Sequence, residues 1–476
     1  MSEKLIKILK EKGPIKKIGV IGMGYVGIPA AALFADAPCF DHVLGFQRAS
    51  SSSGYKIDML NRGESPLKGE EPGLEDLLQK VVKAGKFTCT SDFSRISELD
   101  AVTLAIQTPF EDPKSLLPDF TALIEGIKNV GKNLRKGMLV VLESTITPGT
   151  TIGMAREILE KESGLVAGED FALAHAPERV MVGRLLQNIR EHDRIVGGID
   201  DVCTKRAVEL YTPVLTKGKV IPMTATAAEV TKTAENTFRD LQIAAANQLA
   251  LYCEAMGINV YDVRAGIASL KGEGITRAIL YPGAGVGGHC LTKDTYHLER
   301  GVTLGIEPLD YPENAESIYV LARRVNDFMP KHMFNLTVKA LERIGKKPKG
   351  IKIAMLGWAF LNDSDDARNP PSEPYRDMVL QAGCEIKVHD PHVVHYPGID
   401  IHANIDEVLT GADVVVIFTG HKQYFGLTPE QIKQKMGKKQ PVIIDGRNVI
   451  DPDRFINAGF VYKGIGRGDK NGHSLK

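Results

Sequence analysis

Short apolar runs recur along the first part of the chain, and segments of helical period separate most of them. The first run ends at Ile21, and the others lie at 42–46, 100–106, 138–145 and 170–177. Short runs of this kind are typical of buried strands. Their alternation with helices predicts a parallel sheet with helical crossover connections.

The first apolar run leads directly into a glycine-rich turn. Gly22, Gly24 and Gly27 form the pattern G-x-G-x-x-G, and an Ala-rich helix follows. In this setting the first glycine makes the turn, the second admits a pyrophosphate and the third lets helix and strand pack. The free N–H groups of the helix N-terminus then face the phosphates. The sequence therefore predicts a dinucleotide site here.

Loops 106–112 and 143–150 follow later strands and should line the same crevice.

The middle of the chain changes to one long helical pattern at 226–257. Lys232, Asn236, Arg239 and Asn247 follow each other at helical steps, beside a face of Ala and Leu. A solvated face is one interpretation of this stripe. Large hydrogen-bonding side chains among small residues favour the other, a ligand cleft.

A second α/β pattern begins near residue 350 and is joined to the first part by a helical segment at 316–345. Further buried strands are predicted within 384–391, 412–420 and 441–448. Segment 389–402 carries four histidines whose spacing fits no metal motif, so we interpret it as a surface loop without a metal.

Composition narrows the function classes. The 476 residues suggest two or three domains, and Lys plus Arg equals Asp plus Glu at 59 each. This balance gives no support to a nucleic-acid or membrane partner. The N-terminus lacks the apolar core of a signal peptide, so we expect a cytoplasmic protein. The cysteines are scattered and form neither a zinc motif nor a disulfide framework.

One cysteine stands apart because of its neighbours. Cys290 lies in "PGAGVGGHCLTKD", at 282–294, where glycines crowd around a single thiol. Glycines let the backbone pass close to a ligand and would leave the thiol accessible. Cationic neighbours such as Lys232 or Lys293 would favour the nucleophilic thiolate. A thiol beside a nicotinamide suggests attack on an aldehyde, oxidation of the adduct to a thioester, and hydrolysis to an acid.

At this point the sequence resembles the nucleotide-sugar 6-dehydrogenases, the group that contains UDP-glucose dehydrogenase and UDP-N-acetylmannosamine dehydrogenase. The resemblance spans nearly the whole chain, and "PERV" and "ENTFRD" resemble the branch that oxidises N-acetylated hexosamines. The ordered matches are "VIGMGYVGIPAA", "TPF", "ESTITPGT", "APERVMVGR", "AAEVTKTAENTFRD", "PGAGVGGHCLTKD", "GWAFLNDSDDARNPPS", "HDPHV" and "IDGRN".

The resemblance implies catalytic roles. Cys290 is the nucleophile, and Lys232 and Asn236 hold the C6 oxygen, with the lysine stabilising oxyanion character. Asp294 helps to deprotonate and position water. Glu178, in the "PE" loop, is implied to activate water for thioester hydrolysis, and Thr145, in the "ST" loop, is implied to order water near C6.

The resemblance also implies binding residues. The cofactor is expected to contact Gly22, Gly24, Tyr25, Val26, Gly27, Thr108, Pro109, Thr145 and Arg368. Besides Glu178, Lys232 and Asn236, the sugar nucleotide is expected to contact Arg179, Val180, Arg239, Arg277, Tyr281, Gly283, Gly285, Phe360 and Arg447.

The chain departs from the family pattern at the end of the second strand. The expected acidic residue is missing from "VLGFQRASSSSG", which has Gln47 and Arg48 instead. A ribose 2′-OH loses its usual acceptor there, while an arginine can accept a 2′-phosphate. We keep NAD as the cofactor and leave NADP open. The family's lysine after "AF" is Leu361, and a glutamate of the UDP-glucose branch is Val182.

These patterns predict an α/β protein with two Rossmann-like domains joined by a central helical dimerisation segment. The expected domains are 1–210 for the cofactor, 211–330 for dimerisation and catalysis, and 331–476 for the nucleotide sugar. We expect a homodimer or higher homo-oligomer that oxidises C6 of an NDP-N-acetylhexosamine, such as UDP-N-acetylmannosamine or UDP-N-acetylgalactosamine, with two NAD. The alternatives are a UDP-glucose 6-dehydrogenase, a two-electron dehydrogenase of the β-hydroxyacid type and a non-catalytic nucleotide-sugar sensor.

Overall fold

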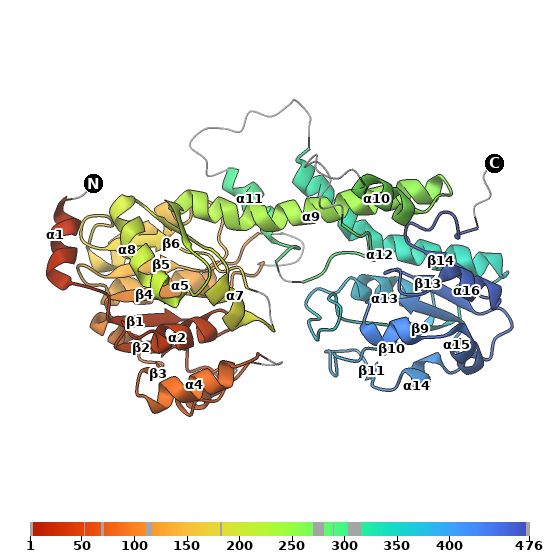
Figure 1. Ribbon diagram of the computed structural model, residues 1–476, viewed down its shortest axis with the longest axis horizontal. Coiled ribbons are helices and arrows are strands. Elements are labelled where there is room, and N and C mark those ends of the chain that lie inside the picture. Colours follow the sequence, from red (N-terminus) through yellow and green to blue (C-terminus); the bar gives the residue numbers. More distant parts are fainter. Residues whose placement is uncertain are drawn as a thin grey trace. The chain divides into compact units, whose positions relative to one another are not determined.

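The computed structural model describes residues 3–51, 53–67, 71–110, 117–180, 183–269, 280–288, 290–302 and 316–472. The chain divides into two compact units (Figure 1). The first contains Met1–Glu235 with Tyr296–Tyr311, and the second contains Asn236–Thr295 with Pro312–Lys476. Among the described residues, no helix combines the length and apolar character needed to cross a membrane.

The first unit is built on one sheet in the order β3-β2-β1-β4-β5-β6-β7-β8. Its strands are β1 (Lys17–Ile21), β2 (His42–Phe46), β3 (Phe87–Thr90), β4 (Ala101–Leu104), β5 (Leu139–Leu142), β6 (Ala172–His175), β7 (Arg194–Gly198) and β8 (Val220–Thr224). Strand β4 is buried along its whole length, as expected for a strand covered on both faces. Each strand predicted in this region is confirmed.

Two sets of helices cover the two faces of this sheet, each with its own hydrophobic cluster. One cluster contains residues of α2 (Gly27–Asp36), α4 (Leu74–Lys83), α7 (Leu185–Glu191) and α8 (Asp201–Tyr211). The other contains residues of η1 (Phe93–Glu98), α5 (Thr121–Asn133) and α6 (Arg156–Ser163). The unit also contains α1 (Glu3–Lys12), α3 (Tyr55–Asn61), η2 (Thr151–Ala155) and η3 (Thr212–Val214).

The predicted strands β2, β1, β4, β5 and β6 all pair parallel, as expected, and the one antiparallel junction of this sheet joins them to a strand that the sequence analysis did not predict. Strand β7 runs antiparallel to β6, with Ala174 opposite Gly198 and His175 opposite Gly197. Strand β8 then pairs parallel with β7 and forms the sheet edge. An edge strand tolerates the missing N–H of Pro222, which lies in β8.

The second unit carries a six-stranded parallel sheet in the order β11-β10-β9-β12-β13-β14. Its strands are β9 (Lys352–Leu356), β10 (Glu385–His389), β11 (Ile401–His402), β12 (Val414–Ile417), β13 (Val442–Asp445) and β14 (Val461–Gly464). Its helices are α10 (Val260–Ala268), α12 (Ile318–Arg343), α13 (Ser372–Gln381), α14 (Ile405–Leu409), η4 (Lys422–Gly426), α15 (Pro429–Met436) and α16 (Pro452–Asn457). The long helix α9 (Ala225–Ala255) and α11 (Asp294–Val302) each have residues in both units.

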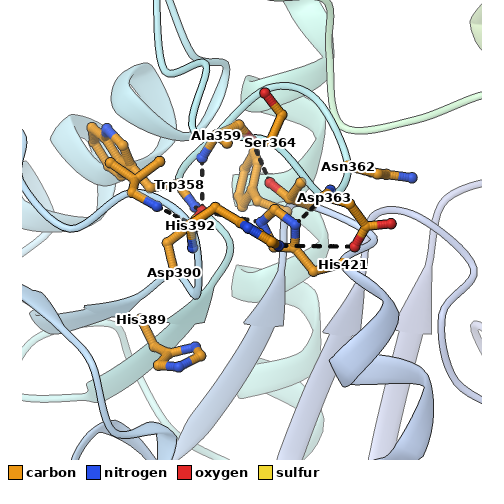
Figure 2. A network of polar contacts seen from close by, with 12 residues as sticks. Trp358, Ala359, Asn362, Asp363, Ser364, His389, Asp390, His392 and His421 are labelled. Atoms are coloured by element: carbon orange, nitrogen blue, oxygen red, sulfur yellow. Dashed lines mark hydrogen bonds and ion pairs between the residues drawn. The ribbon is translucent and has the colours of Figure 1, made fainter. Parts of the chain in front are cut away.

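The carboxyl edge of the second sheet is organised by Asp390, the residue after β10 (Figure 2). Its buried carboxylate accepts hydrogen bonds from the backbone N–H groups of Trp358, Ala359, His392 and Val393 and from Nε2 of His421. Burial opposes the charged form, but these donors outweigh it and hold the pKa of Asp390 at about 2. The carboxylate therefore ties the loops after β9, β10 and β12 together.

An Asp390→Asn variant should unfold its unit more easily, by about 3 kcal/mol at neutral pH, because hydrogen bonds to a charged acceptor are lost. The folded-state pKa of Asp390 lies below the unfolded value, so the aspartate stabilises the fold above the unfolded pKa. That stabilisation is lost as pH falls toward about 2. Urea unfolding at neutral and acidic pH measures both effects. Asp400→Asn is the control, because 92% of the Asp400 side chain is exposed, and an equal effect there would contradict the prediction.

Candidate functional site

The glycine turn after β1 opens a cavity of about 410 Å³ at the carboxyl end of the first sheet. A Cβ on Gly27 would lie 2.1 Å from the carbonyl oxygen of Gly22, so α2 can approach β1 only at a glycine. Gly22 has φ +99° and a Cβ there would meet the Ala105 carbonyl at 2.6 Å, whereas Gly24 faces open space. This backbone fits a dinucleotide, whose pyrophosphate needs free N–H groups and no intervening side chain.

Several sequence-predicted cofactor residues surround this turn. Gly22, Gly24 and Pro109 line the cavity. Thr108 is buried, and its hydroxyl donates to the Thr145 carbonyl at 2.6 Å, so the two predicted loops meet. Tyr25 and Val26 are half-buried in the turn that leads into α2.

The far end of the cavity is lined by residues after β2. Gln47 stands where the family pattern has an acid; its Oε1 accepts from the Met23 N–H at 3.3 Å and its Nε2 donates to Ser53 Oγ at 2.9 Å. Arg48 pairs with Glu125 of α5, with Nη1 2.9 Å from Oε2. All of these residues line the cavity.

A buried ionic network lies behind the predicted "PE" loop. The Arg194 guanidinium, on β7, pairs with Glu178 and, at 3.0 Å, with Glu143, and it donates to the Ala176 carbonyl at 2.8 Å. The Tyr211 hydroxyl donates to Glu143 at 2.7 Å, and burial and then the Glu143 charge raise the pKa of Tyr211. Glu178 is therefore held as one partner of a buried ion pair.

Sequence reasoning missed Arg194, Glu143 and Tyr211. The available signal is a charged residue that opens an otherwise apolar strand, "RIVGG", since buried charges in strands are nearly always paired.

The neighbouring predicted residues are less enclosed. Arg179 is half-buried and pairs with Glu235 at 3.4 Å, and Val180 packs against the core of the first unit.

Helix α9 carries four polar residues that the sequence placed on or near one ligand-facing stripe. Lys232 is buried, Asn236 is half-buried one turn later, and Arg239 is exposed. Asn247 does not fit that interpretation. Its amide donates to Asn326 at 2.9 Å and accepts from the Gly283 N–H at 2.9 Å, so it is a buried structural residue.

Cys290 is exposed and lies in a tight turn at the start of α11. Its carbonyl accepts from the N–H groups of Lys293 and Asp294, at 3.1 and 2.9 Å. The fully buried Asp294 carboxylate accepts from Asn236 Nδ2 at 2.6 Å and from Lys293 Nζ at 3.1 Å. Three of the predicted catalytic residues, Cys290, Asn236 and Asp294, thus lie within one hydrogen-bonded cluster.

The glycines before Cys290 make room for protein side chains. A Cβ on Gly287 would lie 2.5 Å from the Phe360 side chain, and one on Gly288 would lie 2.8 Å from its ring. A Cβ on Gly283 would lie 2.6 Å from the Arg447 guanidinium. Phe360 and Arg447, two of the predicted nucleotide-binding residues, therefore pack against this glycine segment, which the sequence analysis did not foresee.

The remaining predicted residues are placed as follows. Gly285 has φ +126° and packs on proline side chains, and the exposed Tyr281 ring lies under the Arg264 guanidinium at 3.7 Å. Arg368 is held by Asp366, with Nε 2.8 Å from Oδ1, and its carbonyl accepts from the Gly288 N–H. Arg277 and Val182 lie outside the described residues.

The four-histidine segment is only partly a surface loop. His389 is buried against Tyr424, and His392 lies near His421 and Asp363 (Figure 2). In His421, Nδ1 accepts from the Asp363 N–H at 2.9 Å and Nε2 pairs with Asp390. Both ring nitrogens are engaged, so this histidine offers no lone pair to a cation in this arrangement.

Three domains of one protein family match successive parts of the chain. The NAD binding domain of the UDP-glucose/GDP-mannose dehydrogenase family matches residues 16–215, the central domain of that family matches 226–318, and its UDP binding domain matches 354–452.

Individual relatives match almost end to end. A UDP-N-acetyl-D-mannosamine dehydrogenase from Pyrococcus horikoshii is 36% identical, across 95% of this chain and 100% of the relative. The Escherichia coli K12 protein of the same name is 33% identical, across 88% and 96%. The crystal structure of an NDP-N-acetyl-D-galactosaminuronic acid dehydrogenase from Methanosarcina mazei Go1 is 76% identical, covers 100% of both chains and has a TM-score of 0.94.

Proposed function

The chain belongs to the UDP-glucose/GDP-mannose dehydrogenase family, and from this premise we propose that it oxidises C6 of an NDP-N-acetylhexosamine to the uronic acid in two successive two-electron steps. It is an NAD-dependent nucleotide-sugar dehydrogenase with an NAD-binding and a UDP-binding domain. The choice of an N-acetylhexosamine as substrate rests on the 76% identity to a structure named as an NDP-N-acetyl-D-galactosaminuronic acid dehydrogenase. We therefore propose the galacto epimer first and the manno epimer, named for the curated relatives, second.

The proposed chemistry begins with the exposed thiol. Cys290 Sγ adds to C6 of the aldehyde produced by the first oxidation, which gives a thiohemiacetal, and the second oxidation leaves a thioester. Water then displaces the sulfur, which returns as the thiol and releases the carboxylate. When bound, the nicotinamide accepts one hydride from C6 in each oxidation. The exposure of Cys290 and the turn that holds it support this role.

The other residues handle charge and protons. The Lys232 ammonium stabilises negative charge on the C6 oxygen, and the Asn236 amide, fixed by Asp294 at 2.6 Å, orients it. Asp294 and Thr145 position water. Glu178 faces Arg194, so in this proposal it acts as a fixed negative charge beside the water as much as a proton acceptor.

The reduced cofactor formed per sugar nucleotide tests the reaction. Two moles of NADH should form for each mole of UDP-N-acetylgalactosamine, because alcohol to acid is a four-electron oxidation. A ratio of one with free aldehyde would indicate a two-electron dehydrogenase. Binding without turnover would indicate a sensor.

The same assay, run over a substrate panel, tests the substrate branch. UDP-N-acetylgalactosamine or UDP-N-acetylmannosamine should exceed UDP-glucose in kcat/KM by roughly 100-fold or more, since a site built to bond an acetamido group rejects an analogue without it. UDP-glucose as the best substrate would contradict the hexosamine assignment.

The three-domain division at 210 and 330, the dimer and the cytoplasmic location stay predictions. Size-exclusion chromatography with light scattering measures the oligomer directly.

A further inference from the structure

The ribose end of the cofactor cavity lacks the acid that normally rejects NADP. Gln47 occupies the position after β2, and both ends of its amide are engaged, with the Met23 N–H and with Ser53 Oγ. A neutral amide held in this way does not repel a 2′-phosphate. Discrimination at this site must therefore come from another residue.

Two cations lie near this end. Lys56 Nζ donates a hydrogen bond to the Met23 carbonyl at 2.9 Å, which holds the lysine at the glycine turn. Burial also lowers the pKa of Lys56. Arg48 is 61% exposed and lines the cavity, which makes it the cation that could receive a phosphate. Without a counter-charge, Arg48 would favour NADP.

That counter-charge is the Glu125 carboxylate, 2.9 Å from Arg48 Nη1. Glu125 projects from the first turns of α5 and lines the same cavity as Gln47 and Arg48. The pair is exposed, and an exposed ion pair is a weak bond. Its effect on selectivity is electrostatic: the carboxylate cancels the guanidinium charge and repels a dianionic phosphate.

We propose that Glu125, a residue of α5, selects NAD over NADP in this chain by supplying the negative charge that the position after β2 lacks. The proposal rests on the proposed use of this cavity for the nicotinamide dinucleotide. It assigns a specificity role to a helix residue distant in sequence from the strand that usually carries it.

The test is the ratio of kcat/KM for NADP to that for NAD in wild type, Glu125→Gln, Arg48→Ala and the double variant. Glu125→Gln should raise the ratio about tenfold, since the freed arginine can pair with the 2′-phosphate. In the double variant the gain should disappear, because there is no cation left to receive the phosphate. Glu157→Gln, an exposed glutamate on α6 that does not line the cavity, makes the same change in net charge and should leave the ratio unchanged.

An unchanged ratio in Glu125→Gln overturns the proposal, and so does a gain that persists in the double variant. Dissociation constants for NADH and NADPH, measured by cofactor fluorescence without sugar nucleotide, test cofactor selection by Glu125 separately from the proposed oxidation of the hexosamine. A shifted binding ratio in an enzyme that turns over no hexosamine supports the role of Glu125 and contradicts the proposed reaction.

Discussion

A Cys290→Ser variant should bind cofactor and sugar nucleotide much as wild type does, yet lose turnover to the uronic acid by roughly a thousandfold or more. A serine hydroxyl is a far weaker nucleophile than a thiolate, so the covalent adduct on which the second oxidation depends does not accumulate. The exposed position of Cys290 lets the substitution leave the fold intact. Steady-state kcat with the preferred hexosamine measures the loss.

Cys39→Ser is the matched control, because Cys39 is also exposed but lies far from the "GGHC" motif in sequence; its turnover should stay at the wild-type level. Mass spectrometry of Glu178→Gln during turnover should show the acyl group on Cys290. Full activity in Cys290→Ser, or an adduct on a different cysteine, would contradict the thioester route.

Replacing Arg194 by Met should destabilise the first unit by about 3–5 kcal/mol, because two buried carboxylates lose their partner. The arginine side chain is only 6% exposed, and those of Glu143 and Glu178 are 1% and 7% exposed. Activity should fall as well, since the loop that carries Glu178 is held by this side chain. Denaturant unfolding followed by two probes, one for each unit, locates the loss.

Arg156→Met provides the comparison, because Arg156 pairs with Glu160 one turn further along α6, where 43% and 29% of the two side chains are exposed. That variant should lose less than about 1 kcal/mol. Equal losses in the two variants would mean that burial of the Arg194 network contributes nothing beyond an ordinary surface pair.

The local sequence pattern was sufficient to predict those strands, helices and turns that depend on residues close together in the sequence. The strand at 42–46 is β2 residue for residue, and the helix predicted at 226–257 is α9 to within a few residues. The glycines at 22, 24 and 27 mark the cavity because their effect is confined to one turn.

Local pattern failed where distant segments meet. The antiparallel pairing of β7 with β6, and the partners of Asn247 and Arg194, depend on residues far away in the sequence. The same holds for Glu125, whose relevance appears only when α5 places it opposite Arg48. Of the polar residues along α9, Lys232 and Asn247 are buried and Arg239 is exposed, so the fold decides which of them contact protein.

The packing of Gly287 and Gly288 against Phe360 has a consequence for redesign of the enzyme. A Cβ at Gly287 or Gly288 would lie 2.5 or 2.8 Å from the Phe360 side chain, closer than real Cβ contacts allow. Single-site mutagenesis libraries at these glycines should therefore return almost only the parent residue. Truncating the Phe360 ring does not release Gly287, because a Cβ there would still meet the Phe360 Cβ at 2.5 Å and the Asn369 carbonyl oxygen at 2.7 Å. It does not release Gly288 either, because a φ of +91° strains any residue other than glycine. Over evolutionary time both positions should therefore stay glycine even where the residue at 360 changes.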